Sequence, residues 1–191
     1  MEDKTTTATP ALTEKKKLGQ PSASEDTASP YPDMGLCQQL HMLTVRGEIT
    51  VDPNLLGNVL NKVAKELENP SLYRHVQKSL NVSEGTLSEE AVVEMEARNS
   101  KRLEELEAKV EEAKESAGDM EVMDARMEIA RFAAKSLSKE QALEAYKKLL
   151  DLPKISSGKK IDALMESSRV ASFYGDTAKS DELIESVSFQ T

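Results

Sequence analysis

The chain has 191 residues and a formal net charge of −9, with three Phe, four Tyr, no Trp, two His and one Cys. A single cysteine excludes an internal disulfide and a zinc site built from several thiolates. The acidic balance argues against a nucleic-acid partner held by counterion release, and no apolar run approaches the roughly 20 residues that cross a bilayer. We therefore expect a soluble protein of a reducing compartment with neither a nucleic-acid nor a membrane partner.

Residues 1–35 differ in composition from the rest of the chain. They hold four of the seven prolines together with many Thr and Ser, and they have few large apolar side chains. Such a segment buries too little apolar surface to offset an ordering cost of about 1–2 kcal/mol per residue. We predict a disordered tail over residues 1–35. The run of lysines at 15–17 is shorter than the basic clusters of about 5–8 residues that bind import receptors, which favours a short solvated charge run.

Residues 36–86 are predicted to be helical. Asp52-Pro53 is a typical helix start, and Asn69-Pro70 ends the helix that follows. The apolar stripe of that helix is formed by Leu56, Leu60, Val63 and Leu67. A second short helix is expected over residues 72–80. Cys37 and His41 are four residues apart, but no third ligand is near in the sequence, so we predict no metal site.

Residues 87–118 are predicted to form one long helix, from about Ser88 to Ala117 and close to 45 Å in length. Apolar residues recur at spacings of three and four, at Leu103, Leu106, Val110, Ala113 and Ala117. We expect Gly118 to end the helix in a left-handed conformation. We also expect ion pairs one turn apart, between Glu94 and Arg98 and between Glu105 and Lys109.

This long segment carries most of the negative charge, because its ten acidic residues outnumber five basic ones. Paired glutamates suggest carboxylate catalysis or calcium binding, but on a continuous helix a solvated face is the simpler interpretation. The apolar stripe has two interpretations, a coiled-coil seam or a long helix laid across other helices. A coiled coil needs three to four heptads and the clean run covers barely two, so we prefer the second interpretation.

Residues 119–191 are predicted to form short paired helices. The first carries two apolar stripes, which indicates a helix sandwiched between neighbours. Ser138 and Gln141 fit a capping box that opens the next helix. That helix contains Ala142-x-x-Ala145-Tyr146, which resembles the second helix of a tetratricopeptide repeat. A further helix is expected after Gly158, broken at Gly175, and a short last helix follows. Four methionines on apolar stripes are assigned to the core, namely Met95, Met123, Met127 and Met165.

These patterns predict an all-α fold, in which a disordered tail (1–35), an N-terminal helical region (36–86) and a long helix (87–118) precede tetratricopeptide-like hairpins of an α-solenoid (119–191). The sequence has no phosphate-binding glycine motif and no Cys–His arrangement typical of nucleophilic catalysis. We therefore expect no catalytic, cofactor-binding or metal-binding residues and no enzymatic activity.

Five segments, in order and at similar spacing, resemble one family. They are residues 69–80, which begin with Asn69-Pro-Ser-Leu-Tyr73; residues 99–126, which end with Asp119-Met-Glu-Val-Met-Asp-Ala-Arg126; residues 140–148, which begin with Glu140-Gln-Ala-Leu-Glu-Ala-Tyr146; Gly158-Lys-Lys-Ile-Asp162; and Phe173-Tyr-Gly-Asp176. Over residues 69–185 the chain resembles the 26S proteasome lid-subunit family of non-ATPase regulatory subunit six, called subunit seven in the other common naming. Met123 replaces the usual Arg of the family. The related signalosome subunit shares the layout but fits residues 119–126 less well.

The resemblance implies a non-catalytic scaffold subunit of the proteasome lid, acting in ubiquitin-dependent protein degradation in the cytoplasm and nucleus, with other lid subunits as partners and no cofactor. Family members continue into a winged-helix PCI domain, and we expect this chain to carry only the N-terminal arm and the first repeats. The expected packing or interaction positions are Leu103, Leu106, Val110, Ala113, Tyr146 and Phe173. Alternatives are a signalosome-like scaffold, a free-standing helical-repeat adaptor that binds a peptide, and a coiled-coil homodimer through residues 92–117.

Overall fold

The computed structural model describes residues 31–45, 54–82, 87–116 and 118–188, and every regular element in these ranges is helical. In chain order the elements are α1 (Met34–Thr44), α2 (Leu55–Asn61), the π-helical turn η1 (Lys62–Glu66), α3 (Pro70–Leu80), α4 (Glu89–Ser116), α5 (Asp119–Ser136), α6 (Lys139–Leu150), α7 (Ser157–Phe173) and α8 (Thr177–Ser188). The all-α fold class is thus confirmed.

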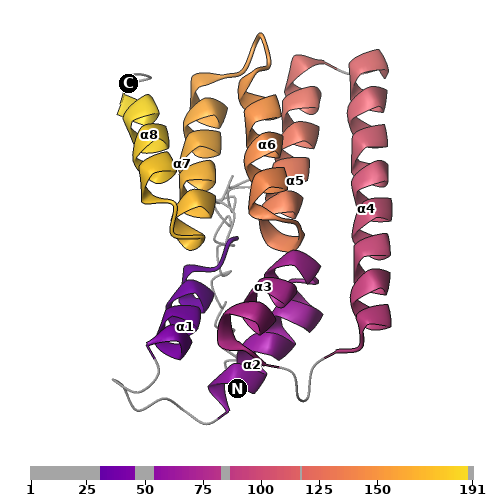
Figure 1. Ribbon diagram of the computed structural model, residues 1–191. Helices are drawn as coiled ribbons and strands as arrows, with labels where there is room; N and C mark the ends of the chain where they lie inside the picture. Colours follow the sequence, from indigo (N-terminus) through magenta and orange to yellow (C-terminus); the bar gives the residue numbers. More distant parts are fainter. Residues whose placement is uncertain (1–30, 46–53, 83–86, 117, 189–191) are drawn as a thin grey trace, which may run out of the picture.

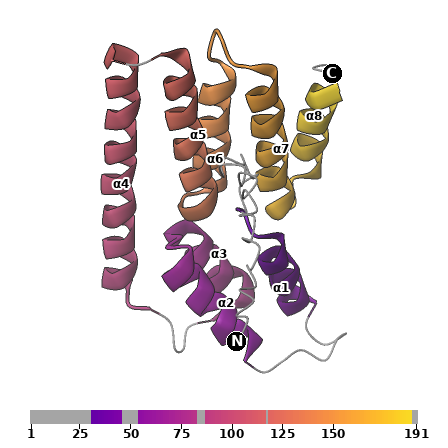
Figure 2. The same ribbon diagram turned by 180° about the vertical axis from the view of Figure 1, so that it is seen from behind.

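Helices α4 to α8 stand side by side in chain order, each running opposite to its predecessor (Figures 1 and 2). The pairs α5–α6 and α7–α8 are helical hairpins joined by short turns, as in a helical-repeat protein. Helices α1, α2 and α3 form a second group beneath the lower ends of α5 to α7, and α4 is long enough to extend beside both groups (Figure 1). The described part of the chain is therefore a helical-repeat row with an N-terminal helical group packed beneath the ends of α5 to α7.

Two apolar clusters hold the fold together. The first joins α4, α5, α6 and α7 through residues such as Leu106, Met127 and Tyr146. The second joins the N-terminal helices to the start of α4 and the end of α7, through residues such as Leu72 and Phe173. Both stripes predicted for α5 contribute buried side chains, as expected for a sandwiched helix. The prediction for Met165 was wrong, because its side chain is 50% exposed on α7.

The predicted long helix corresponds to α4, with ends that agree to within a residue. The conformation predicted for Gly118 was wrong. Its φ of −99° and ψ of 177° are extended, and it caps the N-terminus of α5. Its N–H donates to Glu121 Oε2 at 3.0 Å. The reason is that α5 begins at the very next residue, so Gly118 belongs to the start of α5 and not to the end of α4.

The ion pairs predicted within α4 were also wrong. Arg98 instead pairs with Glu68 at 3.0 Å, and Lys109 pairs with Glu128 at 3.2 Å. The side chains of Arg98 and Lys109 each reach a neighbouring segment because α4 is packed along its length against α3 and α5. The ion pairs of Arg98 and Lys109 therefore connect α4 to other elements, whereas Arg102 with Glu105 and Lys114 with Glu111 form pairs within α4, three residues apart.

The N-terminal helical group begins inside the segment for which we predicted a tail. Asp33 caps α1 by accepting from the N–H of Gly35 at 2.8 Å, and Lys62 pairs with the same carboxylate at 2.6 Å. The Lys62 ammonium holds the pKa of Asp33 below its usual value. Residues 1–30 of the predicted tail and the expected helix start at Asp52-Pro53 lie outside the described residues. The predicted stripe from Leu56 to Leu67 runs through α2 and η1, where the helix widens into a π-helical turn.

Candidate interaction groove

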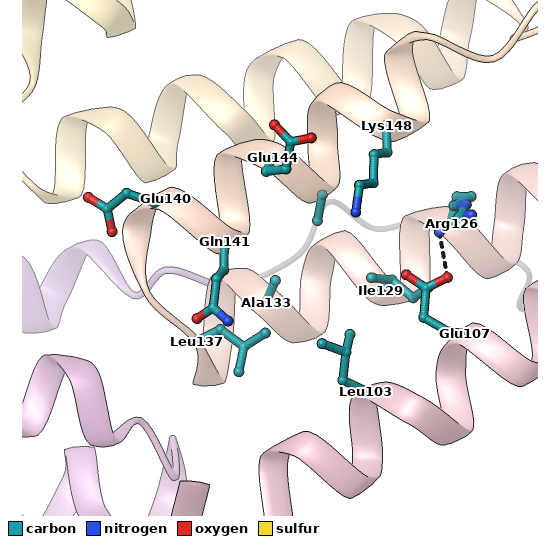
Figure 3. Close-up of a pocket in the computed structure, with 11 residues that line it drawn as sticks. Leu103, Glu107, Arg126, Ile129, Ala133, Leu137, Glu140, Gln141, Glu144 and Lys148 are labelled. Atoms are coloured by element: carbon teal, nitrogen blue, oxygen red, sulfur yellow. Dashed lines mark hydrogen bonds and ion pairs between the residues drawn. The ribbon is translucent and has the colours of Figure 1, made fainter.

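A cavity of about 380 Å³ opens between α4 and α6, across the surface of α5 (Figure 3). Helix α5 forms the floor and the other two helices form the walls. The contributing residues are Leu103 and Glu107 from α4, Arg126, Ile129, Ala133 and Leu137 at or after α5, and Glu140, Gln141, Glu144, Ala145 and Lys148 from α6. We call this feature the α5 groove.

The floor of the α5 groove is apolar. Ile129 and Ala133 are buried, as is Ala145 of the adjoining α6 wall, while Leu103 and Leu137 are half-buried at the edges of the groove. Ala133 and Ala145 have side chains of one carbon, so they bring the α5 and α6 backbones together and leave space above them. The apolar stripe of α5 that contains Ile129 and Ala133 therefore faces the groove as well as the core.

The α6 wall carries charges at a regular spacing. Glu140, Glu144 and Lys148 are four residues apart, so they follow one another along the same face of α6. Within the described residues, no ion pair involves any of these three side chains. On the opposite side, Arg126 donates to Glu107 at 2.7 Å, and this pair closes one end of the groove (Figure 3). The wall is thus acidic at its Glu140 end and basic at its Lys148 end.

The expected packing or interaction positions lie in several places. Leu106, Val110 and Tyr146 are fully buried in the first apolar cluster, where α4, α5, α6 and α7 meet. Ala113 is half-buried near the end of α4, and Phe173 is buried in the second cluster with its ring 5.0 Å from that of Tyr174. Of the six positions, only Leu103 lines the α5 groove. The other groove residues were not identified from the sequence, because the space between α4 and α6 depends on how three helices pack.

A buried carboxylate behind the groove was also missed. Glu166 on α7 is 1% exposed, and it accepts from Arg131 Nη2 at 2.8 Å and from the Tyr146 hydroxyl at 2.9 Å. Burial and the neighbouring Glu166 charge raise the pKa of Tyr146. This network connects α5, α6 and α7, and it keeps the floor and one wall of the groove in register. The only sequence signal is a glutamate within a helix rich in Ala and Ser.

A second polar network fixes the N-terminal helices to the repeat row. Asn99 Nδ2 on α4 donates to the carbonyls of Glu68 at 2.7 Å and Ser136 at 3.1 Å. Asn69 Nδ2 donates to the carbonyl of Leu137 at 2.9 Å, and Ser136 Oγ donates to the carbonyl of Leu67 at 2.6 Å. These bonds supply donors to carbonyls at the ends of η1 and α5, which have no partner within their own helices. We call this network the asparagine junction.

Cys37 and His41 do not form a site. Cys37 Sγ lies 3.5 Å from the carbonyl oxygen of Phe173, and the His41 side chain is exposed. In the described part of the chain, no group of three or more His, Cys, Asp or Glu is arranged to hold a metal ion. Within the same residues, no helix combines the length and apolarity needed to cross a bilayer.

The family model described as 26S proteasome subunit RPN7 matches residues 88–188. This range coincides with helices α4 to α8, so it contains the whole repeat row, the α5 groove and the Glu166 network.

Proposed function

Since the chain belongs to the 26S proteasome subunit RPN7 family, we propose that it is a non-catalytic structural subunit of the proteasome lid, acting in ubiquitin-dependent protein degradation. The observation that carries this proposal is the match over residues 88–188, which extends over more than half of the chain. The family implies contacts with other proteasome subunits, and we propose that the cytoplasm and nucleus are the compartments in which they occur.

The mechanism that we propose is docking of helix faces onto neighbouring subunits. Two packed helical parts support it, namely the repeat row and the N-terminal helical group, which the asparagine junction joins. A rigid arrangement lowers the entropic cost of binding, because fewer side chains and loops are ordered on association. The parts of this scaffold that we propose are the N-terminal helical region, which extends to residue 86 and includes α1 from Met34, the long helix (87–118) and the hairpins (119–191).

The coiled-coil homodimer is not supported by the packing of α4. Its apolar stripe is already used within the chain, since Val92 and Met95 contact the N-terminal cluster and Leu106 and Val110 contact the repeat cluster. All four side chains are at most 2% exposed. A homodimer through residues 92–117 would need this stripe on the surface.

Affinity purification tests the proposed function. The full chain carries an affinity tag and is expressed at its natural level, and mass spectrometry quantifies the co-purified proteins. We expect proteasome lid subunits to be enriched, and we expect Leu106→Asp, which places a charge in the repeat cluster, to abolish this enrichment. Glu112→Gln alters an exposed side chain of the same helix and serves as the matched control. Recovery of signalosome subunits, or of no proteasome subunit, would contradict the proposal.

A further inference from the structure

The α5 groove is an apolar surface that nothing in the described chain covers. Its volume of about 380 Å³ is near the lower limit of about 300 Å³ for pockets that enclose a small ligand. The space therefore accommodates a few side chains of a segment laid across the opening, and not the whole of a bulky ligand. The apolar lining formed by Ile129, Ala133 and Ala145 requires those side chains to be apolar.

The lining of the groove distinguishes between the known ways of binding a peptide. Addition of a β-strand needs a sheet edge, and the described residues contain only helices. Proline-rich segments bind to aromatic side chains, and no aromatic residue lines this groove. Phosphorylated or acidic segments need a cluster of free arginines, whereas Arg126 is paired with Glu107 and three glutamates are present. The remaining mode of binding is insertion of an amphipathic helix, which contacts the groove through apolar side chains three or four residues apart.

The charges along the α6 wall determine the sequence pattern of this helix. From Glu140 through Glu144 to Lys148 the wall covers nine residues, or about 12 Å of helix axis. A partner helix of about two turns matches this length. Charge complementarity requires basic side chains opposite Glu140 and Glu144 and an acidic side chain opposite Lys148, so that no like charges face each other.

We propose that the α5 groove binds an amphipathic helix of another proteasome subunit, which places apolar side chains on Ile129, Ala133 and Ala145 and presents two basic residues and one acidic residue, four residues apart, to the α6 wall. This assignment rests on the proposed function, because it takes the partner from the same assembly.

Photo-crosslinking identifies the occupant. The full chain carries the crosslinker p-benzoylphenylalanine in place of Lys148, and a matched chain carries it in place of the exposed Glu112 on α4. Both are purified from cells, irradiated and analysed by mass spectrometry. We expect position 148 to crosslink to a helical segment of another proteasome subunit that has the proposed charge pattern, and we expect position 112 not to reach that segment. A crosslink to a second copy, to residues 1–30 of the same chain or to a segment without this pattern overturns the inference.

Charge neutralisation tests the pattern itself. A synthetic peptide with the sequence of the crosslinked segment is titrated with the full chain and followed by fluorescence anisotropy. We expect Glu140→Gln with Glu144→Gln to weaken binding about three- to tenfold, and Glu104→Gln with Glu112→Gln, at exposed positions outside the groove, to leave it unchanged. Circular dichroism establishes that each variant is folded. Equal binding by both double variants overturns the charge assignment.

The two proposals fail in different ways. Proteasome subunits that co-purify without any crosslink from position 148 contradict the assigned occupant and leave the proposed function intact. A crosslinked helix from a protein outside the proteasome, without co-purified proteasome subunits, contradicts the proposed function and the assigned partner together.

Discussion

Glu166 is a single carboxylate that connects three helices. It lies on α7, and its Oε1 accepts from Nη2 of Arg131 on α5 at 2.8 Å. Nε of Arg131 lies 3.2 and 3.1 Å from the two carboxylate oxygens, and Oε2 also accepts from the hydroxyl of Tyr146 on α6 at 2.9 Å. The carboxylate is 1% exposed, whereas the Arg131 side chain is 27% exposed. A buried carboxylate is stable only when cations and hydrogen-bond donors compensate its lost hydration. The packing of these helices therefore depends on all three residues being present.

We expect Glu166→Ala to lower the free energy of unfolding by about 3 kcal/mol. The substitution removes the acceptor of the buried Tyr146 hydroxyl and the counter-charge of the partly buried Arg131, and it also leaves a cavity. Urea unfolding followed by circular dichroism measures the change. Glu185→Ala, at an exposed position of α8, should change the stability by less than about 0.5 kcal/mol. Similar unfolding midpoints for the two variants would show that the buried carboxylate contributes nothing.

The buried hydroxyl of Tyr174 makes the free energy of unfolding depend on pH in the alkaline range. Its burial, with a contribution from the nearby Glu140 charge, raises the pKa of its hydroxyl to about 12, compared with about 10 in an unfolded chain. The folded pKa is the higher one, so this contribution is fully present below pH 10 and is lost between pH 10 and 12. We expect the wild-type chain to lose about 2–3 kcal/mol more than Tyr174→Phe over this interval. Urea unfolding of both proteins from pH 9 to 12 measures the difference, and parallel curves would contradict the prediction.

Individual positions were predictable where burial follows from local periodicity. The repeat-like motif singled out Tyr146, and the structure buries it completely. Glu166 was not identified, because its partner Arg131 is 35 residues away and nothing local distinguishes it from an exposed glutamate. Met165 was assigned to the core on its spacing alone, but α7 turns that side chain away from its neighbours.

At the scale of secondary-structure elements, the asparagine junction connects η1, α4 and α5. Asn99 interrupts the apolar stripe of α4 between Met95 and Leu103, and its amide is directed at two carbonyls from different segments. Because both carbonyls lie at the ends of their elements, they have no intrahelical partner and would otherwise be buried without a donor. Asn99 is therefore polar, although it lies in an apolar stripe, because carbonyls at the ends of two other elements need its amide as a donor.

We expect Asn99→Ala to destabilise the fold by about 1–3 kcal/mol, since it leaves the carbonyls of Glu68 and Ser136 without the Asn99 donor. Hydrogen exchange should show faster opening where the N-terminal helices meet α5. Ser100→Ala on the exposed face of the same helix is the control and should have little effect. Unchanged exchange in Asn99→Ala would mean that apolar packing alone fixes this contact.

Elements were predictable from the sequence where one local signal decided their ends. The capping box at Ser138 forms as predicted, with its hydroxyl accepting from the N–H of Gln141 at 3.2 Å. Gly118 was misassigned because a glycine between two helices serves equally as the end of one or the start of the next. The α5 groove could not be predicted, since its walls come from residues as far apart as Leu103 and Lys148.

At the scale of the whole molecule, α4 joins two apolar clusters into one structure. Its first half contributes Val92 and Met95 to the N-terminal cluster, and its second half contributes Leu106 and Val110 to the repeat cluster. The asparagine junction lies between these halves. Since one continuous helix belongs to both clusters, separating them requires α4 to be broken or one cluster to be exposed.

This arrangement predicts that both clusters unfold together. Leu72→Ala in the N-terminal cluster and Leu106→Ala in the repeat cluster should each cost about 2–5 kcal/mol and should each move a single transition to lower urea. Hydrogen exchange at low urea separates the two regions, because amides of α3 and α6 report on different clusters. If Leu72→Ala accelerates exchange in α3 while α6 keeps its wild-type protection, the clusters are independent units and α4 does not couple them. Equal acceleration in both helices is the expected result, because the free energy lost in one cluster then lowers the stability of the whole chain.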